Sequence, residues 1–473
     1  MPHDDLALAF APVTMLVRRL RTREVSAREL VEVYLARIER LDPAIGSYVE
    51  VLADRARDGA DAADERAAAG EELGPLHGVP ASIKDLHFLA GARLTMGTRS
   101  WEHFVAPVDE HSVARLLRAG AIPLGKTNVP EFGTIAHTDT AMLGPCSTPW
   151  ELGRNAGGSS GGAAAALAAG LCAVSQGSDG GGSIRIPAAV NGLVGLKPSR
   201  DRVSNGPVLG ELSFGLSTSG ALTRTVADAA LLLDVMAGYE PGDPGMAPPP
   251  ARPWSAALDE PVDRLRIGVL RRGPTGPATL HPSVDAAIDT TVALLEGLGH
   301  TVEEAVLPED PGLADLVLTL WGANLASQPF DPATFEPVNV WLAEVGRTRT
   351  AADLAAAQFR LQLASRAIIG ATAHLDALLT PVLTGPSRDN GAYRDLPGEA
   401  VFADQARLVG LTPLANLTGQ PAISLPLHHD PDVGPVGVQF VGRPWDEAGL
   451  LRLAAQLEQA APWGDRHPPY AAG

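Results

Sequence analysis

The stretch RNAGGSSGGAAAALAAGLCAVSQGSDGGGSIRIP, which runs from Arg154 to Pro187, decides the fold. It holds two glycine clusters that carry serines, separated by an alanine-rich segment and a short apolar run. Because glycine weakens any helix or strand that it interrupts, each cluster needs a local reason. The candidate reasons are a flexible linker, a phosphate-binding loop, or backbone N–H groups aimed at a reacting atom.

The segments around these clusters alternate between strand and helix patterns. "SSGGAAAALAAG" predicts a helix that begins at a serine cap, and "LCAVSQGS" predicts the strand after it. Earlier in the chain, "GVPASIKDL" is typical of a strand that runs into a loop, and "SVARLLRAGAIPLGKTN" of a helix followed by a strand. This alternation predicts an α/β fold with one large domain, in which helices cover both faces of a sheet.

The outer parts of the chain extend this pattern. We expect one domain over residues 1–473, divided into N-terminal helices at 1–70, a core at 71–240, a variable, partly helical segment at 263–400 and a C-terminal return to the core at 401–473. The first predicted helix begins at the capping box Ser26-Ala27-Arg28-Glu29 and ends at Pro43, and the second covers Val51 to Ala69. A third begins at a Ser283 cap and ends at Gly299, and the segment from Leu313 to Leu375 is predicted to be helical.

Composition limits the possible partners. The 473 residues include 37 basic and 55 acidic side chains, a formal charge of −18, which argues against binding to nucleic acid or to an anionic membrane surface. Cys146 and Cys172 cannot form a disulfide framework, and no apolar run is long enough to span a membrane. The N-terminus lacks a secretory pattern. We therefore expect a cytoplasmic protein, either a monomer or a homodimer.

Lysine is used at three positions only, Lys84, Lys126 and Lys197, and every other basic residue is arginine. Arginine cannot lose its proton inside a protein, whereas lysine can do so when it is desolvated. The three lysines are therefore candidates for a role that arginine cannot fill.

Several chemistries fail on the pattern of residues. A flexible linker does not fit, because the clusters lie between well-formed strand and helix patterns. A phosphate-binding loop would need GxxxxGK[ST] or GxGxxG, and neither motif is present. Residues 157–161 match GxSxG, the nucleophile elbow of α/β-hydrolase esterases, but "PWELGRNA" before them is not the hydrophobic strand that an elbow needs. The histidines are scattered, so we expect no metal site.

Nucleophilic catalysis without histidine remains, and it needs a serine, a base and N–H donors for the oxyanion. "SDGGGS" supplies two of these, because Gly180, Gly181 and Gly182 can form an anion-binding nest beside Ser183.

The motifs "GGSSGGAAAA" and "GSDGGGSIRIPAAVNGLVGLKP" resemble those of the amidase signature family, serine hydrolases that cleave C–N bonds. The motifs "GVPASIKD", "LGKTNVPEFG", "GALTRTVADAALLLDVMAG", "NLTGQPAISLPL" and "PVGVQFVGRPWDE" fit the family in the same order, over most of the chain. Ala221 stands where proline is usual, which leaves the chemistry unaffected.

The resemblance implies a cofactor-free fold with a central mixed sheet and a Ser–Ser–Lys triad. The nucleophile is Ser183, the bridging serine on a cis peptide is Ser159, and the lysine base is Lys84. The chain is most similar to stand-alone bacterial amidases, including aryl acylamidases and nylon-oligomer hydrolases. The resemblance implies small amides as substrates and leaves open carbamates (urethanes) and esters. We expect the loop after "GKTNVPEF" and the segment from Leu313 to Arg407 to shape the pocket. An alternative within the family is the amidase component of a glutamine-dependent tRNA amidotransferase, which works together with a partner protein.

Three neighbouring residues have expected structural roles. Ser160 is expected to cap the alanine-rich helix, and Asp179 to brace the oxyanion loop through backbone hydrogen bonds. Arg185 is expected to form a structural ion pair.

Overall fold

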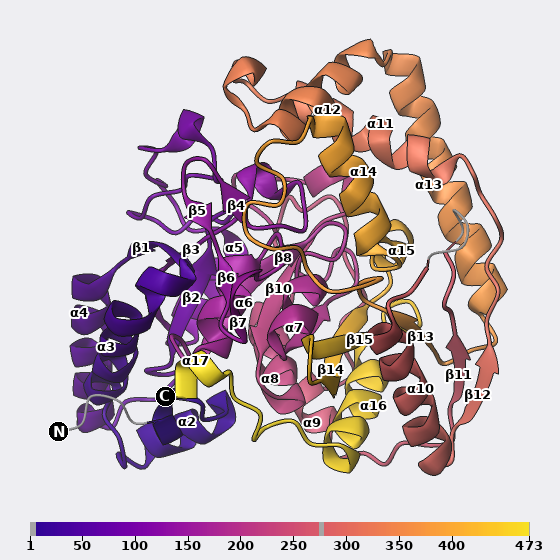
Figure 1. Cartoon of the computed structure of the whole chain (residues 1–473). Coiled ribbons are helices and arrows are strands. Elements are labelled where there is room, and N and C mark those ends of the chain that lie inside the picture. Colours follow the sequence, from indigo (N-terminus) through magenta and orange to yellow (C-terminus); the bar gives the residue numbers. More distant parts are fainter. Residues whose placement is uncertain (1–5, 274–278, 473) are drawn as a thin grey trace.

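A central mixed sheet organises the molecule in the computed structural model, which describes residues 6–273 and 279–472 (Figure 1). Within them the sheet has 11 strands in the order β1-β3-β2-β8-β10-β9-β14-β15-β13-β11-β12. In that order the strands are Tyr48–Val51, Ile122–Thr127, Pro80–Lys84, Val174–Asp179, Thr218–Thr223, Val194–Lys197, Ala422–Asp430, Gly434–Gly442, Ala377–Pro381, Arg266–Val269 and Thr301–Glu304. β2 pairs in parallel with β3 and β8, and β8 pairs antiparallel with β10. The mixed sheet confirms the predicted fold class.

Helices cover both faces of this sheet. On one face Gly195 of β9 and Gly437 of β15 let α7 (Arg185–Asn191) approach closely, since a Cβ atom there would lie 2.6 Å and 2.5 Å from the Cβ atoms of Ala188 and Ala189. Their strand neighbours point to the opposite face, because side chains alternate along a strand. There they pack against α8 (Val226–Met236), α10 (Pro282–Gly297) and α16 (Glu447–Ala460). Because Ser183 lies two residues before α7, the close packing of α7 on the sheet also holds Ser183 near the sheet.

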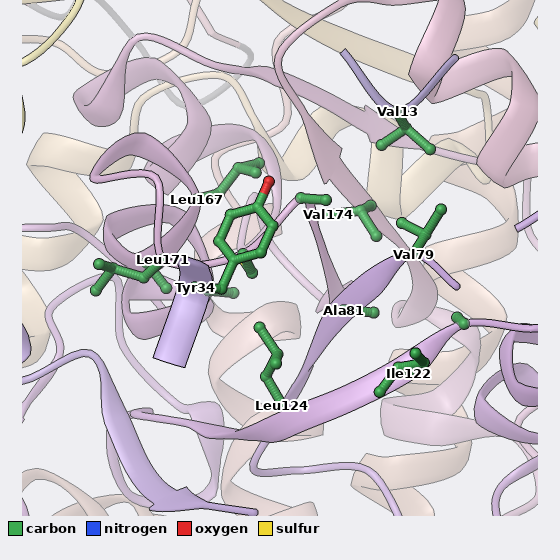
Figure 2. Packing of buried hydrophobic residues seen from close by; sticks show 14 of the residues in the cluster. Val13, Tyr34, Val79, Ala81, Ile122, Leu124, Leu167, Leu171 and Val174 are labelled. Carbon is green, nitrogen blue, oxygen red and sulfur yellow. The ribbon is translucent and has the colours of Figure 1, made fainter. Parts of the chain in front are cut away.

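The N-terminal helices complete the core under β2. Tyr34 of α3 (Ala27–Ile45) is fully buried, and Figure 2 shows it beside Leu167 of α6 (Gly161–Ala168) and Leu171. Val174 and Ala81 in the same cluster come from β8 and β2. This packing ties β2 to α6 and so holds the two segments that carry Lys84 and Ser159.

A group of helices lies at one end of the molecule, beside the site. We call it the helical cover, and it consists of α11 (Leu313–Ala326), α12 (Pro337–Thr348), α13 (Ala351–Thr372) and α14 (Gly398–Val409) (Figure 1). It confirms the helical character predicted for Leu313 to Leu375. α15 (Pro413–Thr418) links it to β14. The finer division of the chain into four segments stays a prediction.

The remaining elements are short or peripheral, and they include α17 at the C-terminus. The helices are α1 (Leu6–Ala9), α2 (Val13–Arg21), α4 (Ala53–Ala69), α5 (His111–Arg118), α9 (Trp254–Ala257) and α17 (Pro469–Ala472). The minor strands are β4 (Asp139–Thr140), β5 (Gly144–Pro145), β6 (Ser147–Thr148) and β7 (Glu151–Asn155). No helix among the described residues has the length and apolar character needed to cross a membrane.

Three predicted helix boundaries are wrong. Pro43 does not end its helix, because α3 continues to Ile45 and Gly46 ends it with a left-handed φ of 71°. A proline in the last turn disturbs only one carbonyl of the helix, so the helix tolerates it. Val51 belongs to β1, where it pairs with Gly125, and the helix begins at Ala53.

The third error concerns the start of α10. Ser283 is not its cap, because the helix begins at Pro282 and the ring of His281 accepts a hydrogen bond from the Ser283 N–H at 3.3 Å. Proline suits the first helical position because its missing N–H has no partner there anyway.

Candidate active site

Lys84 ends β2 and is fully buried. Its Nζ lies 2.8 Å from Oγ of Ser159, and 3.1 Å and 3.3 Å from Oγ and O of Ser178. No carboxylate of the described residues lies within ion-pair distance. Burial therefore lowers the pKa of Lys84 to about 7, and the more distant charge of Asp179 opposes this only in part. The structure thus brings two predicted site residues, Lys84 and Ser159, into direct contact.

The other two lysines have different surroundings. Lys126 forms an ion pair with Asp85 at 3.0 Å and donates to two backbone carbonyls. Burial, reinforced by the nearby charge of Arg185, lowers the pKa of Lys197 to about 7, and its Nζ donates to O of Pro198 at 2.8 Å. Of the three, only Lys84 contacts serine hydroxyl groups in the described structure, so it alone is placed to exchange a proton with one.

Ser159 follows a cis peptide bond after Gly158, as the resemblance implied, and it is almost fully buried. A Cβ atom on Gly158 would lie 2.8 Å from N of His137 and 2.9 Å from the carbonyl carbon of Ala136. No larger residue fits there unless that loop moves. The loop at 134–137 therefore packs directly on the peptide that presents the Ser159 hydroxyl.

Ser160 does not cap the helix that it precedes, so its predicted role is wrong. It is the N-cap residue of α6, but its side chain makes no capping hydrogen bond. Its Oγ donates instead to O of Ser178 at 3.3 Å, and its backbone N–H donates to O of Ser183 at 3.1 Å. Ser160 therefore links the two glycine clusters rather than stabilising the helix end.

The second cluster turns from β8 into α7, and Asp179 holds it. Oδ1 of Asp179 accepts from the Gly182 N–H at 2.8 Å, and Oδ2 accepts from the Ile184 N–H at 3.1 Å. Arg185 forms an ion pair with the same carboxylate, and its Nη2 donates to Oδ1 of Asp179 at 2.7 Å. The predicted brace and ion pair are confirmed.

Electrostatics at this turn favour a charged carboxylate. Burial opposes ionisation of Asp179, but the charge and hydrogen bonds of Arg185 outweigh it, so its pKa lies well below the ordinary range. Asn416 of α15 adds donors to O and Oδ1 of Asp179, both at 2.9 Å. Hydrogen bonds of Asp179, Arg185 and Asn416 therefore stabilise the turn.

Ser183 follows the turn and is 8% exposed. It borders a cavity of about 270 Å³ together with Gly180 and Gly181. The N–H groups of these two glycines have no hydrogen-bond partner in the described part of the chain, whereas that of Gly182 is held by Asp179. Ser183 is connected to the segment of Ser159 by the hydrogen bond that its carbonyl oxygen accepts from the Ser160 N–H. Within the described structure, the Ser183 hydroxyl makes no hydrogen bond with Ser159.

The GxSxG match at 157–161 has the wrong surroundings for a nucleophile elbow. The strand before it is β7, which pairs with β6 in a separate two-stranded sheet and is not part of the 11-stranded sheet. An elbow would follow a strand of the main sheet. The structure therefore gives no support to the α/β-hydrolase alternative.

The segment from Leu313 to Arg407, which the sequence predicts to shape the pocket, forms much of the far wall of the cavity, although the sequence does not indicate which of its residues line it. This wall consists of apolar residues of α11, α14 and α15, with Gln405 and Asn416 among them. The spacing of Leu313, Val317 and Trp321 is that of one helix face, which is a signal that could have identified an apolar surface. It could not have shown that this face turns toward Ser183.

Known proteins match this chain over nearly its whole length. It matches the model of the Amidase family over residues 29–451. Its fold is similar to that of 6-aminohexanoate cyclic dimer hydrolase in complex with substrate, with a TM-score of 0.91, 32% identity, and coverage of 98% of this chain and 99% of that chain. A bacterial aryl acylamidase of the amidase signature family has a TM-score of 0.88, 26% identity, and coverage of 98% of both chains.

A relative with a different activity is also similar. One component of the glutamyl-tRNA(Gln) amidotransferase of Synechococcus sp. (strain WH7803) is 38% identical over an alignment of 477 residues, which covers 94% of this chain and 96% of that protein. The proteins similar to this chain thus include both hydrolases and a subunit of an amidotransferase.

Proposed function

Because the chain belongs to the amidase signature family and is an amide-hydrolysing enzyme, we propose that Ser183 is its nucleophile, with Ser159 as proton relay and Lys84 as base. One observation carries this assignment. The Nζ of Lys84 lies 2.8 Å from Oγ of Ser159 in a buried setting that favours the neutral amine at physiological pH.

The first half of the reaction forms an acyl-enzyme. Oγ of Ser183 attacks the carbonyl carbon of the amide and gives its proton to Ser159, which passes its own proton to Nζ of Lys84. A hydroxyl serves in this position because it both donates and accepts. The negative charge that develops on the carbonyl oxygen is stabilised by the N–H groups of the glycine turn. Gly180 and Gly181 are the better candidates here, since the Gly182 N–H is bonded to Asp179.

The second half returns the proton and releases the products. The Lys84 ammonium returns its proton through Ser159 to the leaving nitrogen, the C–N bond breaks, and the amine departs. Water then attacks the ester on Ser183, with Lys84 again accepting a proton through Ser159. The carboxylic acid leaves and the three groups return to their starting protonation. A carbamate or an ester offers the same electrophilic carbon, so both remain open as substrates.

An activity-based probe tests the assignment of the nucleophile. A fluorophosphonate is expected to modify Ser183 and no other serine, with the adduct located by peptide mass spectrometry. The matched control is Lys84→Met, in which the base is missing and labelling is expected to become much slower. An adduct on Ser159 or Ser160 in the wild-type protein would overturn the assignment.

The similarity to an amidotransferase component supports a second candidate function. In that case the enzyme would release ammonia from glutamine and pass it to a partner protein. Expression in the native host, followed by purification through a tag on this chain, separates the two candidates. Stable stoichiometric recovery of a second protein would favour the amidotransferase, and recovery of this chain alone, active on simple amides, would favour the stand-alone amidase.

A further inference from the structure

No charged side chain lies among the described residues that line the cavity beside Ser183. Its described lining comes from the loop at 134–136, the glycine turn, α11, α14, α15 and the residues next to them. None of these lining residues is Asp, Glu, Lys, Arg or His. The absence is notable because the chain as a whole carries 92 residues of the four fully charged types (37 basic and 55 acidic).

The two amide side chains of the described lining, Gln405 and Asn416, are already bonded within the protein. Oε1 of Gln405 accepts from the Ala136 N–H at 2.8 Å, and its Nε2 donates to Oη of Tyr393 at 2.6 Å. Asn416 is held by Asp179, as described above, and by O of Leu216 at 2.9 Å. These amides support the walls of the cavity, so they are poorly placed to solvate a charged group of a ligand.

The remaining surface is apolar and reaches the glycine turn. Leu313, Val317 and Trp321 of α11 line the cavity together with Phe402 and Val409 of α14. The indole ring of Trp321 lies against the turn, since a Cβ atom on Gly181 would be 3.8 Å from its Cζ2. A group bound next to the reacting carbonyl therefore leaves water for an apolar surface, and a charge there would lose its hydration without gaining a partner.

We propose that this enzyme selects amides in which the group beside the scissile bond is uncharged and apolar, such as an aryl or alkyl group. Free carboxylate and ammonium groups are excluded at that position. The inference rests on the proposed function, because it assumes that Ser183 is where the carbonyl binds. It also disfavours glutamine, a zwitterion whose two charges would enter the same cavity.

A set of matched substrates tests the exclusion of charge. The acyl set comprises the anilides of hexanoic acid, adipic acid (as the mono-acid) and 6-aminohexanoic acid, which share a leaving group and similar chain lengths. The amine set comprises hexanamides of 4-methylbenzylamine, 4-carboxybenzylamine and 4-(aminomethyl)benzylamine. We expect both charged members of at least one set to fall by about 100-fold or more in kcat/KM relative to the neutral member. Glutamine is expected to give no detectable ammonia.

The sign of the effect separates the cavity from the field of the whole protein. A net charge of −18 would slow an anionic substrate and speed a cationic one, and it would weaken as salt is added. Desolvation in the cavity slows both signs and persists in salt. The proposal is overturned if the two charged members differ in direction, or if both stay within about tenfold of the neutral substrate in both sets.

A pair of variants places the effect at the cavity wall. Val317→Asp puts a carboxylate into the lining, and Val317→Asn is the control of equal size without charge. We expect the aspartate variant to improve the cationic substrate relative to the neutral one by about tenfold or more over the asparagine variant. Equal ratios in the two variants, both folded by circular dichroism, would contradict the proposal. If Val317→Asp fails to fold, the wild-type substrate sets still decide.

The outcome can be distinguished from failure of the proposed function. If Ser183→Ala retains hydrolysis of hexanoyl anilide, the assignment of the nucleophile fails, whatever the substrate preference. If Ser183 forms a detectable acyl-enzyme with charged and neutral anilides at similar rates, the proposed function stands and only the inference on charge fails.

Discussion

Two regions border the same cavity: the glycine-rich core, which comprises Lys84, Ser159 and the turn from Asp179 to Arg185, and the helical cover. Each region is stabilised internally by a different kind of interaction. In the core, buried polar groups are joined by directed bonds, such as those of Asp179 with Arg185 and the Gly182 N–H. The cover is held by apolar packing, with Leu316 and Leu320 of α11 against Leu361 of α13. A buried polar network fails when one member changes, whereas an apolar interface accepts other residues of similar volume.

This difference separates chemistry from selection. Under the proposed function, the core supplies the groups that carry out bond cleavage, and the cover supplies the surface that selects the substrate. We therefore expect substitutions in the core to act on the rate for every substrate, and substitutions in the cover to change the ranking of substrates.

The largest effect is expected at the nucleophile. Ser183→Ala removes the atom that we propose forms the acyl-enzyme, so kcat should fall by about 10⁴-fold or more for every amide. Kinetics with one neutral and one charged substrate, together with fluorophosphonate labelling, measure this. A loss confined to one substrate would place Ser183 among the residues of selection rather than of chemistry.

The base is the next largest. Lys84→Arg keeps the positive charge, but arginine does not give up its proton in a protein, so we expect a loss of about 10²–10⁴ in kcat. Lys126→Arg is the matched control, since Lys126 is equally buried but paired with Asp85 at 3.0 Å. It should lower thermal stability and leave turnover per folded molecule nearly unchanged. A folded Lys84→Arg enzyme with near-normal turnover would refute the Ser–Ser–Lys mechanism.

The pH profile tests the same residue without mutation. Burial lowers the pKa of Lys84 to about 7, and only the neutral amine accepts a proton. Below that pH the lysine is protonated, so kcat/KM should fall by about tenfold per pH unit, and above it a plateau should appear. Initial rates from pH 5 to 9 with a neutral substrate, with circular dichroism at each pH, give the measurement. A flat profile through pH 7 in a folded enzyme would contradict a lysine base.

A smaller, selective effect is expected in the cover. Trp321→Ala opens the apolar wall beside Gly181, so kcat/KM for hexanoyl anilide should fall by about tenfold, while that for acetanilide changes little. Phe359→Ala is the control from the same cover, because Phe359 is 62% exposed on α13 and does not line the cavity. Equal losses for the long and short acyl groups would mean that Trp321 supports the core rather than selects substrates.

Chelation is expected to have no effect. Among residues 6–273 and 279–472 no group of three or more His, Cys, Asp or Glu side chains is placed to hold a metal ion. Incubation with EDTA, followed by dialysis, should leave kcat unchanged for neutral amides. Loss of activity that zinc restores would reveal a metal site that neither region accounts for.

Sequence by itself determined the part of the molecule whose chemistry is local. The pattern SDGGGS predicts a serine beside exposed N–H groups because glycine has no side chain to shield them. The scarcity of lysine indicated Lys84, Lys126 and Lys197, and the family resemblance then selected Lys84 among them. The order of the motifs then indicated the family and, with it, a central mixed sheet. The bracing role of Asp179 and the ion pair of Arg185 were predicted separately, and the structure shows that the two residues, six positions apart, bond to each other.

Tertiary structure alone decided the contacts between distant segments. Ser160 lies where serine normally caps a helix, yet its hydroxyl donates to the carbonyl oxygen of Ser178 in β8. Val51 belongs to a strand because it pairs with β3. The wall of the cavity comes from α11, α14 and α15, whose apolar residues indicate from the sequence that these helices pack against other parts of the protein. Such residues show that a face is buried, but hydrophobic attraction has no direction, so only the packed fold reveals what that face meets.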